Sequence, residues 1–144
     1  MRYLTTLALL IFSLSFYSCS NLEATAEEAA FETMMDVHDE IMPRMGEVNK
    51  LSRELKGLEA ANDTTNRELM GEIDGAIRAL DNAHNDMMAW MNMNGGNKLE
   101  QLRKEKKHDE TMAYILDEEE KIIKVKEDIE TSIQQAQNIL DKVQ

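Results

Sequence analysis

Two short stretches of the sequence repeat one pattern of histidine and methionine. In each, a histidine is followed four residues later by a methionine and three residues after that by another, at His38, Met42 and Met45 and again at His84, Met88 and Met91. Imidazole nitrogens bind zinc and copper, and thioether sulfurs favour copper in its reduced state. The same spacing is also that of a buried helix stripe, where methionine fills gaps in the core. The pattern predicts either a soft-metal site or ordinary packing.

The elements that must position these residues are helices. From Ala24 onward the chain has one proline, few aromatic residues and apolar side chains at steps of three and four, which is the helical period. We predict helices over about 25–60, 65–93 and 97–143. The stretches AANDTT and MNGGN join them, and short joints make consecutive helices antiparallel neighbours. The predicted fold is all-α, an up-down-up antiparallel three-helix bundle of long helices.

Local signals mark the ends and one interruption of these helices. A capping-box pattern opens each of the three, at residues 25–28, 65–68 and 97–100. Pro43 lies inside the first helix, where it cannot donate a hydrogen bond to the Asp39 carbonyl. We therefore expect a kink at Pro43.

Counting from the joints places the three histidines at one height. His84 lies eleven residues before Gly95, and His108 lies twelve residues after Gly96. Counted from the other joint, His38 and His84 differ by three residues, or about 4.5 Å. We predict that His38, His84 and His108 form one core layer that binds Cu(I) or Zn, with Met42 and Met88 as further ligands.

Each histidine also has an ordinary structural interpretation. An imidazole on the apolar side of a helix commonly hydrogen-bonds to a nearby carboxylate, and Asp36, Asp39, Asp81 and Asp86 are close in sequence. The eleven methionines, against three phenylalanines, equally suit a flexible packing role. The interpretation as a metal site depends on the shared height of the histidines.

The N-terminus has the pattern of an export signal. Arg2 is followed by an apolar run over residues 4–16, too short to span a bilayer comfortably, and then by Ser18 and Cys19. A small residue before a cysteine at this point resembles the lipobox of bacterial lipoproteins. We predict a signal peptide over 1–18, a lipidated Cys19 with a short linker over 19–24, and a helical domain over 25–144. Simple secretion and an uncleaved anchor are the alternatives.

Charge and motifs exclude several classes of function. The net charge is −12, and it becomes −13 without residues 1–18, which contain one Arg and no acid. Nucleic acid is not an expected partner, because its binding requires clustered Lys and Arg. The one basic cluster, over residues 103–107, suits a solvated helix face. There is no second cysteine for a disulfide and no P-loop, G-x-S-x-G or H-E-x-x-H motif, so no enzyme is predicted.

The stretches HDEIMPRMGEVNKL and ALDNAHNDMMAWM carry a family resemblance. They resemble segments of small helical lipoproteins from Gram-negative envelopes, whose members are often labelled "viral A-type inclusion protein". The resemblance covers most of the mature chain and implies an envelope lipoprotein without a known activity. Ser20 resembles the residue that permits transfer to the outer membrane in similar lipoproteins, which implies anchoring in the outer membrane.

These observations predict a noncatalytic envelope lipoprotein, held in the membrane through Cys19. The more specific form of this hypothesis is that the protein binds a metal through the histidine and methionine layer. The alternative is a structural or interaction lipoprotein that contacts an envelope protein through helix faces, without metal. For that alternative we expect the last turns of the third helix to project without a partner. Their apolar stripe comprises Ile133, Ala136, Leu140 and Val143.

Overall fold

All regular structure in the part of the chain that can be described is helical. The computed structural model describes the backbone of residues 2–61 and 66–143, and the side chains within these ranges from residue 21 onward. The elements are α1 (Arg2–Ile41), a 3-10 turn η1 (Met42–Arg44), α2 (Met45–Ala61), α3 (Arg67–Asn94), α4 (Lys98–Glu105) and α5 (His108–Val143). The prediction of an all-α fold is confirmed.

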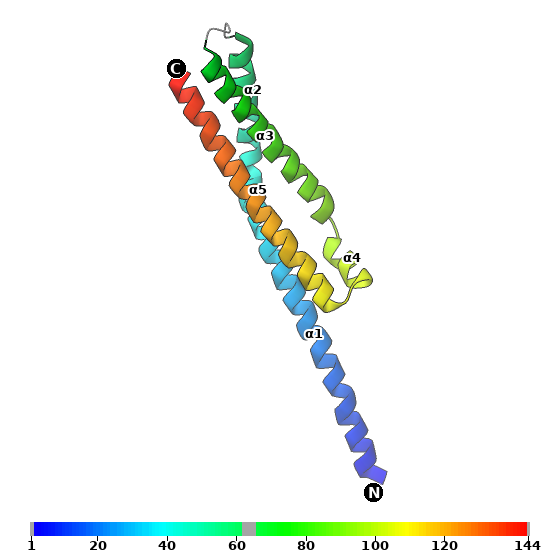
Figure 1. Cartoon of the computed structure of the whole chain (residues 1–144). Helices are drawn as coiled ribbons and strands as arrows, with labels where there is room; N and C mark the ends of the chain where they lie inside the picture. Colours follow the sequence, from blue (N-terminus) through cyan, green and yellow to red (C-terminus); the bar gives the residue numbers. More distant parts are fainter. Residues whose placement is uncertain (1, 62–65, 144) are drawn as a thin grey trace.

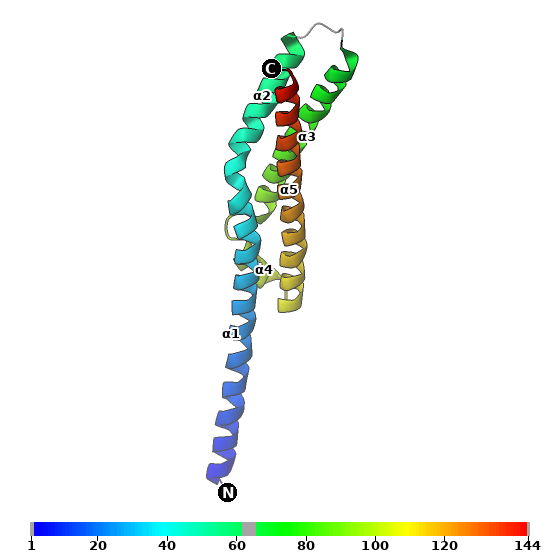
Figure 2. The ribbon, with the colours of Figure 1, turned by 90° about the vertical axis from the view of Figure 1, so that its left-hand side faces the viewer.

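The helices lie side by side along most of the molecule (Figure 1). α1 and α2 follow one path, α3 returns along it, and α5 runs in the same direction as α1, as the second view also shows (Figure 2). α5 contacts α1, α2 and α3, and α2 contacts α3. The N-terminal part of α1 projects beyond the other helices at the end where α4 lies (Figure 1). We call this the α4 end, and the opposite end, where α2, α3 and α5 meet, the far end.

The third predicted helix is divided in two. α4 ends at Glu105, Lys106 has an extended backbone, and α5 begins at His108. Leu99 and Leu102 bury α4 against the rest of the molecule, but residues 103–108 contain no apolar side chain. A helix continued through that run would have nothing to pack, because tertiary burial supplies most helix stability. Gly96, at a φ of +70°, makes the turn before α4.

Two of the predicted helix starts differ from the structure. The first helix does not begin at Thr25, because α1 begins at Arg2 and the Thr25 hydroxyl donates to the Asn21 carbonyl one turn earlier, at 2.8 Å. Thr65 lies outside the described residues. The cap of α3 is Asn66, whose side chain accepts from the Leu69 N–H at 3.2 Å.

Pro43 interrupts the first helical path as expected. It lies within η1, between the end of α1 and the start of α2. A 3-10 turn accommodates the missing donor, since its bonds span three residues instead of four. The result is a local change of helix type at the height where the first path passes α3 and α5.

A continuous apolar core joins the long helices. Its members recur every seven residues on the first path, at Met34, Ile41, Val48 and Leu55, all at most 2% exposed. α3 and α5 contribute matching stripes, centred on Leu80 and Ile122, which are fully buried. Burial of such stripes provides the main favourable free energy of folding.

Candidate functional site

His38 lies in the seam between α1 and α3. Its Nδ1 lies 2.8 Å from a carboxylate oxygen of Asp39, and its ring stacks on Trp90 with centroids 5.6 Å apart. Because the carboxylate can only accept, Nδ1 of the neutral ring donates and Nε2 carries the lone pair. That Nε2 is buried and has no hydrogen-bond partner.

His84 lies three residues after Asp81, which pairs with Lys56 of α2 at 2.8 Å, so His84 is on the side of α3 that faces the first path. Its Nδ1 is also buried without a partner. Trp90, the residue beside His38, lies six residues further along α3, which corresponds to about 9 Å of helix. His38 and His84 therefore face one seam at heights that differ by more than one helical turn.

His108 belongs to a different cluster. Its Nδ1 lies 2.9 Å from Glu27 Oε1, and Glu27 precedes His38 by eleven residues, or about 16 Å of helix. The division of the third helix explains this displacement, because the turn before α5 was counted as helix. The predicted register of His108 with His84 is wrong.

The three histidines thus do not form one layer. A shared ion with bonds near 2 Å requires ring nitrogens within about 4 Å of each other, and the helical rise separates His108 from His38 by far more. Within residues 21–61 and 66–143, no three His, Cys, Asp or Glu side chains gather where they could hold a metal ion. Binding of Cu(I) or Zn by a smaller set that includes Met42 and Met88 stays a prediction.

The methionines take the packing role that was the alternative. Met34 and Met87 are fully buried in the core, while Met42 and Met88 are partly buried and pack against it. Two histidines likewise take the structural interpretation, since Asp39 holds His38 and Glu27 holds His108.

Glu27 is the centre of an ion cluster that joins three helices. Its side chain is 6% exposed and receives Arg103 Nε from α4 at 2.7 Å and His108 Nδ1 from α5 at 2.9 Å. Arg103 also contacts Glu28 at 3.1 Å and donates to the Ala24 carbonyl at 2.6 Å. Burial would raise the pKa of Glu27, but Arg103 and His108 together outweigh it and hold the pKa below its ordinary value.

A second buried carboxylate, that of Glu118, binds the C-terminal residue of α3. Glu118, 1% exposed, accepts from Asn94 Nδ2 at 2.7 Å and from Lys121 Nζ at 2.6 Å. The Trp90 indole donates to the Glu118 carbonyl at 3.2 Å, and the Tyr114 hydroxyl donates to Asn94 Oδ1 at 2.9 Å. This network fixes the height of α3 against α5 and gives Trp90 and Tyr114 structural roles.

A groove runs along the seam between α3 and α5. Three hollows of about 430, 340 and 400 Å³ follow one another, and neighbours share lining residues, Gln135 between the first two and Asp86 with Asp128 between the last two. We call their sum the α3–α5 groove. From Gly71 to Met93 it extends over about 33 Å of helix. Its α3 wall consists of Gly71, Glu72, Gly75, Ala76, Ala79, Asn82, Ala83, Asp86, Ala89, Trp90 and Met93.

The last turns of α5 do not project. Ile133 and Ala136 are 2% and 0% exposed, Leu140 packs against the core, and Lys142 pairs with Glu72 of α3 at 2.9 Å. The expectation that the stripe ending at Val143 lacks a partner is therefore wrong. The first path is long enough to cover it, because α2 also contacts α5.

The predicted lipid attachment falls outside the described side chains, since the side chain of Cys19 precedes residue 21. The predicted linker over 19–24 is part of α1. Within the part of the chain that the structure describes, no helix has the length and apolar character needed to cross a membrane.

Comparisons with protein-family models, curated proteins and solved structures give no match for this chain. The resemblance to envelope lipoproteins therefore stays an expectation, based on the stretches around His38 and His84.

Sequence reasoning missed Glu27, Glu118 and the α3–α5 groove, although Glu27 and the groove each left a signal. Glu27 falls on the seven-residue series that continues with Met34 and Ile41. A carboxylate on a buried stripe requires a buried partner, which points to a basic residue on another helix. The groove has a signal in Gly71 and Gly75, two small residues on one side of a helix.

Proposed function

We propose that this chain is a noncatalytic lipoprotein of the cell envelope, anchored in the outer membrane through a lipid on Cys19. Its long helices act as an up-down-up three-helix bundle that presents the α3–α5 groove to another envelope protein. The single observation that carries the proposal is the groove, since a bundle of this kind normally fills its seams with interdigitating side chains.

The occupant we propose for the groove is one amphipathic helix of the partner protein. A Cβ added at Gly71 or Gly75 would meet nothing within 4 Å, so a helix can approach the α3 backbone closely at these positions. The length of about 33 Å suits a helix of about 22 residues.

Charge favours a basic occupant. Asp86 and Asp128 line the middle of the groove from its two sides. Asp128 pairs with Lys124, another lining residue, at 2.8 Å, so Asp86 is the carboxylate that a basic residue of the partner would meet, in a chain with a net charge of −12. A Lys or Arg on the partner helix would face complementary charge there, which favours encounter and fixes register.

A photo-crosslinking amino acid at Asn82, which lines the groove, tests this proposal in cells. We expect one discrete adduct to an envelope protein, with the crosslink in a helical basic segment, and none from the same group at Glu120, an exposed residue of α5 that lines none of the groove hollows. The adduct should be lost in Gly75→Leu, whose larger side chain fills the groove. Gly75→Leu should not lower the melting temperature, because leucine is the better helix former.

Equal adducts from Asn82 and Glu120, or an adduct that survives Gly75→Leu, would contradict the groove as the binding surface. An adduct of twice the chain's own mass would identify a second copy as the occupant and so reject a heterologous partner.

Metal binding with fewer ligands is the second candidate, and one observation favours it. His38 Nε2 and His84 Nδ1 are buried ring nitrogens without hydrogen-bond partners, and Asp39 holds His38 as a carboxylate commonly holds a metal-binding imidazole. Because of the offset of about 9 Å along α3, we propose that one Cu(I) or Zn ion takes one imidazole, with the thioethers of Met42 and Met88.

Titration with Cu(I) and with Zn tests this candidate by two readouts. Binding should raise the melting temperature by linkage and change the fluorescence of Trp90, which stacks on His38. We expect loss of both effects in His38→Ala or in His84→Ala, whichever imidazole is used, and their retention in His108→Ala. A wild-type chain whose melting temperature and fluorescence do not respond to either metal would reject it.

A further inference from the structure

The α4 end carries a basic segment of an acidic chain. Residues 98–107 contain five basic side chains and two acidic ones, a net charge of +3, while the whole chain has −12. Sequence alone suggested a solvated helix face for this cluster. The structure adds where the cluster lies, which is the end of the molecule from which the N-terminal part of α1 projects (Figure 1).

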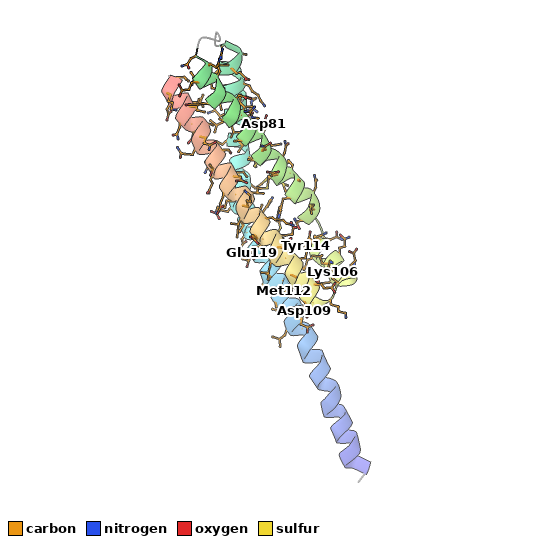
Figure 3. The ribbon with its side chains drawn as sticks, viewed as in Figure 1. Asp81, Lys106, Asp109, Met112, Tyr114 and Glu119 are labelled. Carbon is orange, nitrogen blue, oxygen red and sulfur yellow. The ribbon has the colours of Figure 1, made fainter. Side chains whose placement is uncertain are left out.

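The fold directs the basic side chains of this element outward. Leu99 and Leu102 are buried, at 7% and 2% exposure, and Arg103 is bound by Glu27. α4 is therefore docked by one side. Lys104, Lys106 and Lys107 are exposed, and within the described residues they have no ion pair. Figure 3 shows Lys106 beside α4 at this end of the molecule.

The same cluster sets the distance of these lysines from the proposed anchor. Glu27 contacts both Arg103 and His108, so the turn with Lys106 and Lys107 is close to the height of Glu27. Cys19 precedes Glu27 by eight residues within the continuous helix α1, or about 12 Å. An extended lysine side chain shortens this distance to the bilayer surface. The remaining gap is comparable to the electrostatic screening length of about 8 Å at physiological salt, so the lysines can interact with charged headgroups.

We propose that Lys104, Lys106 and Lys107 bind the headgroups of anionic phospholipids and hold the α4 end against the bilayer surface. This inference rests on the proposed lipid at Cys19. Residues 19–24 are helical in α1, and Arg103 donates a hydrogen bond to the Ala24 carbonyl. Cys19 is therefore joined to the α4 end by a helix and not by a flexible linker. The acidic remainder of the molecule is repelled by the same surface, which points the α3–α5 groove and the far end away from the membrane.

Fluorescence quenching on vesicles tests the inference with the lipidated full-length protein. A dye at Gln101→Cys, an exposed position of α4, reports the distance to a quencher on lipid headgroups, and a dye at Ala60→Cys, near the far end, is the control position. We expect stronger quenching at Gln101 on phosphatidylcholine vesicles with 30% phosphatidylglycerol than on phosphatidylcholine alone, and none at Ala60. Each lysine near an anionic surface should shift the docking equilibrium about fivefold.

A charge-matched pair of variants separates the basic end from net charge. Lys104→Gln with Lys106→Gln and Lys107→Gln should abolish the extra quenching, as should 0.5 M NaCl. Lys50→Gln with Lys124→Gln and Lys142→Gln removes the same charge from exposed positions elsewhere and should leave the extra quenching unchanged.

Flotation with neutral vesicles measures the anchor separately. If the chain fails to float, or floats equally well as Cys19→Ala, the proposed anchor is wrong and the inference falls with it. If it floats through Cys19 but quenching at Gln101 is the same with and without phosphatidylglycerol, the anchor stands and the inference about the basic end is overturned.

Discussion

The two ends of the molecule are both held by ion pairs, but of different kinds. At the α4 end, Glu27 is 6% exposed and receives cations from two other helices. At the far end, Lys56 pairs with Asp81, and Lys142 with Glu72, each at 41–60% exposure. A carboxylate removed from water must keep its partners, whereas an exposed pair exchanges readily with solvent. The α4 end therefore depends on its charges for its geometry more than the far end does.

This difference matches where the chain is least continuous. Near the α4 end the helices are interrupted twice, at Gly95–Gly96 and at Lys106–Lys107, so α4 has few apolar contacts of its own. The ion pairs of Glu27 with Arg103 and His108 take the place of these apolar contacts, because they connect α4 and α5 to α1. At the far end long apolar stripes already hold α2, α3 and α5 together, and ion pairs there add little.

The largest effect is expected from removing the buried carboxylate. Glu27→Ala leaves Arg103 and His108 without their shared partner in a partly buried site, and breaking a buried pair in this way costs about 3 kcal/mol. Thermal and urea unfolding should show that loss, and hydrogen exchange should show greater opening of α4 than of α2.

The comparison with the far end requires a matched removal there. Glu72→Ala takes away the partner of Lys142, and its expected effect is below about 1 kcal/mol. If Glu27→Ala and Glu72→Ala destabilise the protein equally, the distinction between the two ends is wrong.

The glycines of the two ends should respond in opposite directions. Gly71→Ala and Gly75→Ala add a Cβ in open space within α3, and together they should stabilise the protein by about 1.5 kcal/mol, because alanine is the better helix former. Gly96→Ala, at a φ of +70°, should destabilise it by about 1 kcal/mol. Melting temperatures of the double and single variants provide the measurement. A stabilising Gly96→Ala would show that the turn before α4 is not strained by a side chain.

The contrast between the ends also shows what the sequence could predict. Helical period and joint composition predicted the all-α fold, because those signals are local. The position of His108 depended on whether helix continued through residues 97–108, which is decided by tertiary packing of Leu99 and Leu102. The predicted height of His108 was wrong for that reason, since one break in a helix moves every later residue relative to its neighbours.

Acid should loosen the α4 end. The pKa of Glu27 in the folded protein lies below the ordinary value of 4.5, so its contribution to stability is complete above about pH 4.5 and is lost as the pH falls through the folded pKa. The effect should be smaller than that of Glu27→Ala, because the protonated carboxyl still accepts hydrogen bonds. Between pH 5 and pH 3 the free energy of unfolding of the wild type should therefore fall relative to that of Glu27→Gln. The slope should be at most about 1.4 kcal/mol per pH unit, the value for one proton. A constant difference between the two over that range would contradict a titrating Glu27.

The smallest effect is expected from Lys142→Ala at the far end. Lys142 is 60% exposed and its partner Glu72 is 41% exposed, so water solvates both charges once the pair is broken, and the change should stay within about 0.5 kcal/mol. Added salt should screen the Lys142–Glu72 pair in the wild type and remove even this difference in stability. The loss of stability in Glu27→Ala should persist in 0.5 M NaCl, because the three helices around the Glu27 carboxylate shield it from ions. Urea unfolding of both variants at low and high salt measures this directly. A loss in Lys142→Ala that exceeds about 1 kcal/mol or survives added salt would mean that the far end, too, depends on a desolvated ion pair.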